Sequence, residues 1–134
     1  MSDFNKELTE KDVDKIILDL IKLHLESVKV NESEFLDLLK HSLSLNTMEK
    51  KRVIDAVPTL SQFQFDELSK VFIEEREKFK ELSKEHPDDI RKLLWKQQKE
   101  WLQLGDLYKM EKETEEKKED EQKKIDDIKS QFGL

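Results

Sequence analysis

The fold of this chain is decided by residues 61–110, which read SQFQFDELSKVFIEEREKFKELSKEHPDDIRKLLWKQQKEWLQLGDLYKM. Ser61 and Gln64 form the capping box of one helix, which the pattern extends to about Glu85. Pro87 and the two aspartates after it restart a second helix, because proline suits the first helical turn and acids complement the positive helix end. The segment therefore predicts two long helices joined by a very short turn.

Two helices joined in this way are expected to fold back as an antiparallel hairpin. A turn near His86 sets the register, and the predicted facing pairs are Phe79 with Leu94, Phe72 with Trp101, Phe65 with Tyr108, and Leu68 with Gly105. A glycine at such a position lets the two backbones approach closely beside a large side chain. Glu75 falls opposite Gln97 and Gln98, which predicts a polar layer that fixes the register.

Three shorter helices are expected before the hairpin. Thr9, Asn31 and Asn46 are N-cap residues, each followed three positions later by an acid, and they begin helices over residues 10–28, 32–43 and 47–57. The chain has two glycines, two prolines and 43% charged residues, and it is rich in strong helix formers. The predicted fold class is therefore an all-α bundle of five helices.

A charged run divides the chain into two parts. Residues 111–124 read EKETEEKKEDEQKK and contain no hydrophobic side chain, so they cannot enter a core. Acid-to-base pairs four residues apart favour a continuing helix, although each contributes only about 0.2–0.5 kcal/mol. We expect a helical bundle domain over residues 1–110 and a charged helical extension over 111–134, ending in a small apolar tip.

The composition narrows the classes of function. The formal net charge is −7 and cysteine is absent, so disulfides and thiolate metal sites are excluded. The sequence has no histidine pair at metal-ligand spacing and no glycine-rich phosphate loop, which predicts a chain without cofactor, metal or catalytic activity. No apolar stretch is long enough to span a bilayer, and the amino-terminal residues lack a signal-peptide core. A cytoplasmic location is expected.

Two sets of apolar residues are candidates for partner binding. Trp95 and Leu102 form a second stripe on the last helix, roughly 90° from its main stripe. Either the short helices cover this stripe, or it anchors a partner contact, where buried tryptophan is enriched. Ile125, Ile128 and Phe132, with Leu134 beyond them, have the spacing of an amphipathic recognition element. This tip binds a partner, folds back on the body, or packs on a copy of itself.

These features predict a non-catalytic helical protein that acts by association with itself, for example as a homodimer, or with a protein partner. The alternative is a small nucleic-acid-associated regulator. Lys50-Lys51-Arg52 is a compact basic cluster on the second of two short helices, as in a helix-turn-helix reader. Glu49, Asp55 and the acidic surroundings argue against nucleic acid and favour a solvated charged face.

A short segment also resembles known sequences. The resemblance is carried by Val57-Pro58-Thr59-Leu60-Ser61, Phe65, Leu68, Phe72-Ile73-Glu74-Glu75 and Lys78. These residues are similar to short uncharacterised helical proteins of candidate-phyla bacteria, in which an LPxLT turn introduces a Glu/Lys-rich helix with a leucine stripe. This chain has Ala56-Val57 where that pattern favours leucines. The resemblance implies a helical fold, and the family has no assigned activity to transfer.

Overall fold

The computed structural model describes residues 7–133, which form helices and no strands. The elements are α1 (Glu10–Ile21), α2 (Glu32–Lys40), α3 (Thr47–Ala56), the short 3-10 helix η2 (Val57–Thr59), α4 (Gln62–Glu85) and α5 (Pro87–Gln131). The predicted fold class is confirmed: an all-α arrangement of three short helices followed by two long ones.

Side-chain caps begin four of the five α-helices, as the sequence predicts. Thr9, Asn31, Asn46 and Ser61 each accept a hydrogen bond from the backbone N–H three residues later. These bonds satisfy backbone donors that have no partner inside the first turn. α5 begins instead at Pro87, with aspartates in its first turn. The starts of the helices are therefore set by local sequence.

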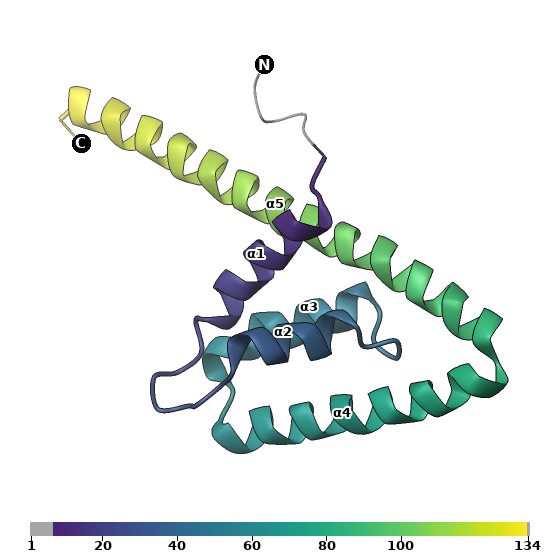
Figure 1. The fold of residues 1–134 in the computed structure, drawn as a ribbon. Coiled ribbons are helices and arrows are strands. Elements are labelled where there is room, and N and C mark those ends of the chain that lie inside the picture. Colours follow the sequence, from purple (N-terminus) through teal and green to yellow (C-terminus); the bar gives the residue numbers. More distant parts are fainter. Residues whose placement is uncertain (1–6, 134) are drawn as a thin grey trace.

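The two long helices form the arms of a wide V (Figure 1). α4 and α5 meet at the short connection around residue 86 and diverge from it. The three short helices lie between the arms, and α5 continues well past α1, so that its end projects away from the rest of the molecule (Figure 1). The helical pair is thus a frame around α1, α2 and α3, rather than a closed hairpin.

The core lies inside this frame and takes side chains from every α-helix. On the α4 side, the ring of Phe35 in α2 lies 5.1 Å from that of Phe65 and 6.1 Å from that of Phe72, measured between centroids. On the α5 side, Trp101 is fully buried. The remaining buried apolar side chains are Val13, Ile17, Ile21, Val28, Leu38, Leu39, Ile54, Val57, Leu60, Ile90, Leu104 and Tyr108.

The predicted pairing of the two long helices is wrong away from their connection. Phe72 packs against Phe35 of α2, whereas Trp101 donates its indole N–H to Asp14 of α1, over 2.9 Å. Gly105 does not face Leu68: a Cβ placed there would overlap the side chain of Val13 in α1. The short helices cover most of each apolar stripe, and Leu82 and Leu94 near the connection stay exposed, so the two arms need not pair along their length.

The predicted polar layer between the long helices is also absent among the described residues. Glu75 accepts a hydrogen bond from the Ser44 hydroxyl at 2.6 Å, in the loop after α2. Gln97 is buried, and within residues 7–133 its side-chain nitrogen has no hydrogen-bond partner. The two residues are therefore held apart by the α2–α3 loop, because Glu75 contacts it and Gln97 lies beside it.

The three short helices end earlier than predicted. α1 stops at Ile21 and not at Val28. The backbone hydrogen bonds after it span three residues instead of the four of an α-helix, from Leu23 N–H to Leu20 O and from His24 N–H to Ile21 O. Val28 still reaches the core after the chain has turned. α2 ends at Lys40 and not at residue 43, and α3 gives way to the 3-10 helix one residue before the predicted end.

The last buried side chain of α5 is Tyr108, and residues 110–133 are all exposed. The helix itself continues without a break to Gln131, so the charged run and the tip are helical as expected. Within the described range, no helix combines the length and the apolar character that crossing a membrane requires.

Candidate partner-binding site

The tip of α5 is a small apolar patch without cover from the described part of the chain. Ile125 and Ile128 are about half exposed, and Phe132, at the C-terminal end of the helix, is 74% exposed. The spacing of three and seven residues places all three on one side of the helix. Leu134 lies outside the described residues. The tip does not fold back on the body, because α5 carries it away from the core (Figure 1).

Trp95 and Leu102 are also on the surface, so the short helices do not cover them. Trp95 is 63% exposed and Leu102 37%. The structure does not bring these two residues together with the tip, because Trp95 and Ile128 are separated by about 50 Å of continuous helix. α5 therefore presents two separate candidate surfaces.

The surroundings of Trp95 are basic. Residues 91–99 contain four basic residues and no acid, in a chain whose net charge is −7. The Lys99 ammonium lies 3.8 Å from the centroid of the Trp95 ring, a cation–π contact. A shallow hollow beside the ring is formed by Asp88, Arg91, Lys92, Leu94, Trp95 and Gln98. We call residues 91–99 with this hollow the Trp95 surface.

A deeper cavity of about 280 Å³ lies where α4 and α5 separate. Its apolar wall comes from α2, the loop after it, and both long helices: Leu38, Leu43, Phe72, Phe79, Ile90 and Leu94. His41, Glu75, Arg76 and Lys80 contribute polar groups to the lining. We call it the corner cavity. Leu94 lines both the corner cavity and the hollow beside Trp95, so the two surfaces are continuous.

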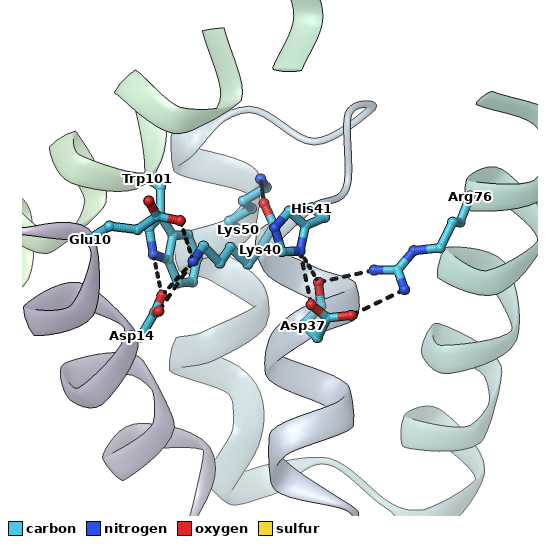
Figure 2. Close-up of polar contacts among 8 residues, drawn as sticks. All are labelled: Glu10, Asp14, Asp37, Lys40, His41, Lys50, Arg76 and Trp101. Carbon is cyan, nitrogen blue, oxygen red and sulfur yellow. Dashed lines mark hydrogen bonds and ion pairs between the residues drawn. The ribbon is translucent and has the colours of Figure 1, made fainter. Parts of the chain in front are cut away.

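The polar groups of the corner cavity are held by a small network that joins α2 to α4 (Figure 2). Arg76 donates from Nη1 to the Asp37 carboxylate at 3.1 Å and from Nη2 to the Asp37 carbonyl at 3.2 Å. His41 Nδ1 lies 3.0 Å from the same carboxylate. This network holds two of the polar lining side chains, Arg76 and His41, against Asp37.

A second network fixes α5 against the short helices (Figure 2). Asp14 accepts the Trp101 indole N–H and also pairs with the Lys40 ammonium at 3.0 Å. Lys50, only 1% exposed, donates to the Lys40 carbonyl at 2.9 Å. Both ammonium groups lie about 6 Å from the Trp101 ring, at 5.9 and 6.0 Å. Burial lowers the pKa of Lys50 to about 8. These contacts anchor the part of α5 from which the tip projects.

The basic cluster at residues 50–52 is not the solvated face that the sequence suggests. Lys50 is buried, and Lys51 pairs with Asp55 at 2.7 Å and with Glu111 of α5 at 2.6 Å. Only Arg52 of the three is exposed. Because phosphate binding needs clustered, accessible cations, this geometry gives no support to a nucleic-acid interface here.

The boundary between packed and unpacked α5 carries a further polar cluster. The Tyr108 hydroxyl donates to the Asp55 carboxylate at 2.7 Å. Burial and this bond raise the pKa of Tyr108 well above its usual value. With the Lys51–Glu111 pair, these contacts hold α5 to α3 at the last point where the helix touches the body.

Sequence reasoning missed two surface features. The corner cavity depends on how three elements meet, for which no local pattern exists. Phe63 is 72% exposed, and here a signal was present: Phe63 and Phe65 are two residues apart, so they point to opposite sides of α4 and cannot both be in the core. Among residues 7–133, no group of three His, Asp or Glu side chains is arranged to hold a metal ion.

Comparison with known proteins identifies no relative of this chain. No family model matches the sequence, and neither a curated protein nor a solved structure matches the chain.

Proposed function

We propose that this chain is a non-catalytic, cytoplasmic protein of helix-mediated association, which acts by binding a second copy or a larger protein through α5. The observation that carries the proposal is the length of α5 beyond the body. Some twenty residues follow the last buried side chain, and they end in three exposed apolar residues: Ile125, Ile128 and Phe132.

The energetics of that segment support an association role. A lone helix in water is only marginally stable, and most helical stability in proteins comes from packing of an apolar face. The charged run can add only small pairwise contributions. Burying an isoleucine or phenylalanine side chain on a partner contributes about 1.5–3 kcal/mol each. The tip thus gains stability from a partner that it does not gain from its own body.

The Trp95 surface supports the same proposal. An exposed tryptophan with Lys99 over its ring and Arg91 in the adjoining hollow suits an interface centre, because Trp and Arg are enriched among residues that dominate binding energy. Because Ile125 and Ile128 are only about half exposed to begin with, burying the three tip side chains would contribute roughly 3–5 kcal/mol, which is at the low end of the roughly 4–15 kcal/mol that association costs in lost freedom. A stable complex therefore needs a second contact besides the tip.

The proposal is tested on the full chain with two single substitutions. Phe132→Glu removes the apolar group at the tip, and Ser130→Glu is the matched control, since it adds the same charge two residues away on the opposite side of α5. Sedimentation from 1 to 200 μM is measured for each, together with capture of proteins from a cell extract. We expect Phe132→Glu to lose self-association or a captured partner, and Ser130→Glu to behave like the parent chain.

A parallel arm tests Trp95→Ala. Since this side chain is exposed, far-UV circular dichroism should be unchanged while association weakens. Identical assembly and identical captured proteins for the parent chain, Phe132→Glu and Trp95→Ala would show that α5 is not an association element.

A further inference from the structure

We infer that the partner of the α5 tip is a second copy of this chain, and that Phe132 of one copy inserts into the corner cavity of the next. The inference rests on the proposed function and names its partner. It pairs an apolar tip that no other described residue covers with an apolar cavity that no described side chain fills.

The cavity has the size and lining for a phenylalanine ring. A cavity of about 150 Å³ lined by aliphatic and aromatic side chains is large enough for benzene. The corner cavity encloses about 280 Å³ and is walled by six apolar side chains. It has room for the Phe132 ring and for part of a neighbouring side chain. Leu38, Phe72 and Ile90 in its wall are already buried, so these side chains lose little conformational freedom on binding.

The tip cannot reach the cavity of its own chain. Ile90 lines the cavity at the start of α5, and Phe132 follows it after 42 residues of unbroken helix, or about 63 Å. The two ends lie at opposite extremes of the molecule (Figure 1). Occupation of the cavity by the tip therefore requires another molecule.

The charges of the two surfaces are complementary. The Trp95 surface, which continues from the cavity through Leu94, carries four basic residues between positions 91 and 99, against one acid in its hollow, Asp88, which pairs with Arg91 at 3.7 Å. The segment 113–132, which leads to the tip, has eight acidic and five basic residues. With Phe132 in the cavity, the preceding turns of the incoming helix lie over Trp95. Opposite net charge then favours this arrangement over the pairing of two tips.

The contact is heterologous, and the assembly grows head to tail. Leu94 and Phe132 are 38 residues apart, which places them about 200° around the helix from each other at about 100° per residue. Two antiparallel α5 helices therefore cannot exchange tips along one common seam. A head-to-tail contact that does not close makes an open chain of molecules.

The experiment uses mixtures of two full-length variants. Phe132→Glu lacks the aromatic ring that enters the cavity, while its own cavity is intact. Leu94→Glu has an intact tip but an acidic cavity mouth, and Leu94 is already 42% exposed, so the fold tolerates the change. Ser83→Trp, which fills the cavity from α4, is a second blocking variant. Ser130→Glu is the control.

Sedimentation of the parent chain should give masses that grow with concentration beyond the dimer and fall in 0.5 M salt. Each blocking variant alone should be monomeric, with association at least tenfold weaker. An equimolar mixture of Phe132→Glu with either cavity variant should give one-to-one dimers that grow no further, because only one productive contact can form.

Three outcomes would overturn the inference. A parent chain that stops at the dimer shows a symmetric interface, and variants that stay monomeric when mixed show that tip and cavity are not partners. A parent chain that is monomeric throughout, while Phe132→Glu alone loses a captured protein, assigns the tip to a different partner. In that last case the proposed function stands and the present inference fails.

Discussion

The buried Lys50 makes a quantitative prediction about stability. Its ammonium is inside the core, where it donates to the Lys40 carbonyl at the end of α2 and lies 6.0 Å from the Trp101 ring. The negative end of a helix and an aromatic face both favour a cation. They do not offset the loss of hydration, because the pKa of Lys50 is lowered from 10.5 to about 8.

The size and sign of the effect follow from this shift. A difference of about 2.5 pKa units corresponds to roughly 3 kcal/mol, at about 1.4 kcal/mol per unit. Below pH 8 the lysine is protonated in both folded and unfolded chains, so the full cost of the buried charge is present. Between pH 8 and 10.5 the folded chain has lost this proton and the unfolded chain still binds it. Stability from this group therefore rises with pH across that window.

Lys50→Met removes the charge and keeps the length of the side chain. The parent chain and Lys50→Met are unfolded with urea at pH 7, 8, 9 and 10, followed by circular dichroism at 222 nm. The free-energy difference between them should move by roughly 2–3 kcal/mol in favour of the parent chain as the pH rises. The lost hydrogen bond to the Lys40 carbonyl adds a constant offset to this free-energy difference. The other titrating groups are the same in both chains, so their contributions cancel in the difference.

The exposed Lys78 provides the matched control, since Lys78→Met makes the same substitution at a lysine that lies outside the core. A difference for Lys50→Met that is flat within about 0.5 kcal/mol would refute the reasoning, because a lysine with unperturbed titration contributes no such slope.

Two further predictions follow from the packing. Gly105→Ala should destabilise the chain by about 1–3 kcal/mol in urea unfolding, because the added Cβ meets the stiff, buried side chain of Val13. This loss outweighs the higher helix propensity of alanine. The double variant with Val13→Ala removes the clash, so if its loss in stability equals the sum of the two single losses, the clash is not the cause. The pKa of His24 is raised by its bond to the Leu25 carbonyl and then by Glu32, so its contribution is complete below pH 6.5 and is lost as the pH rises through the raised value. Melting temperatures across that range should fall less in Glu32→Gln than in the parent chain, and equal slopes would contradict this.

The starts of the helices could be predicted because capping is local. Thr9, Asn46 and Ser61 each bond with a residue three positions away, so the signal and the structure occupy one turn. The ends of the helices were predicted less accurately than their starts. α1 stops at Ile21 because the chain turns toward α2, and the residues from there to Val28 carry no glycine or proline to mark it.

The predicted register of the two long helices was wrong for a related reason. Helical periodicity says which side chains of α5 are buried, and Trp101 and Leu104 are. It does not say what covers them. The partner of the Trp101 indole is Asp14, 87 positions earlier in the sequence, whereas a hairpin prediction pairs each residue only with the adjacent long helix.

The candidate site also has one part that could be predicted from the sequence and one part that could not. Trp95 and Phe132 could be singled out from sequence because they lie off the main apolar stripe or beyond it, and both are exposed. The corner cavity could not be predicted, because its wall needs Leu38, Phe72 and Ile90 from three helices. The burial of Lys50 likewise depends on tertiary packing alone.

The charged run between Tyr108 and Ile125 has a consequence for how such a chain tolerates change. None of its side chains is buried, so beyond Glu111, which pairs with Lys51, and the acidic excess of the run, the identity of each residue is only loosely constrained. Its length is a different matter. Each residue inserted or deleted moves the tip by about 1.5 Å and turns it by about 100° relative to the body. The number of residues in the segment thus sets the direction in which the tip faces, independently of the contacts that individual residues make.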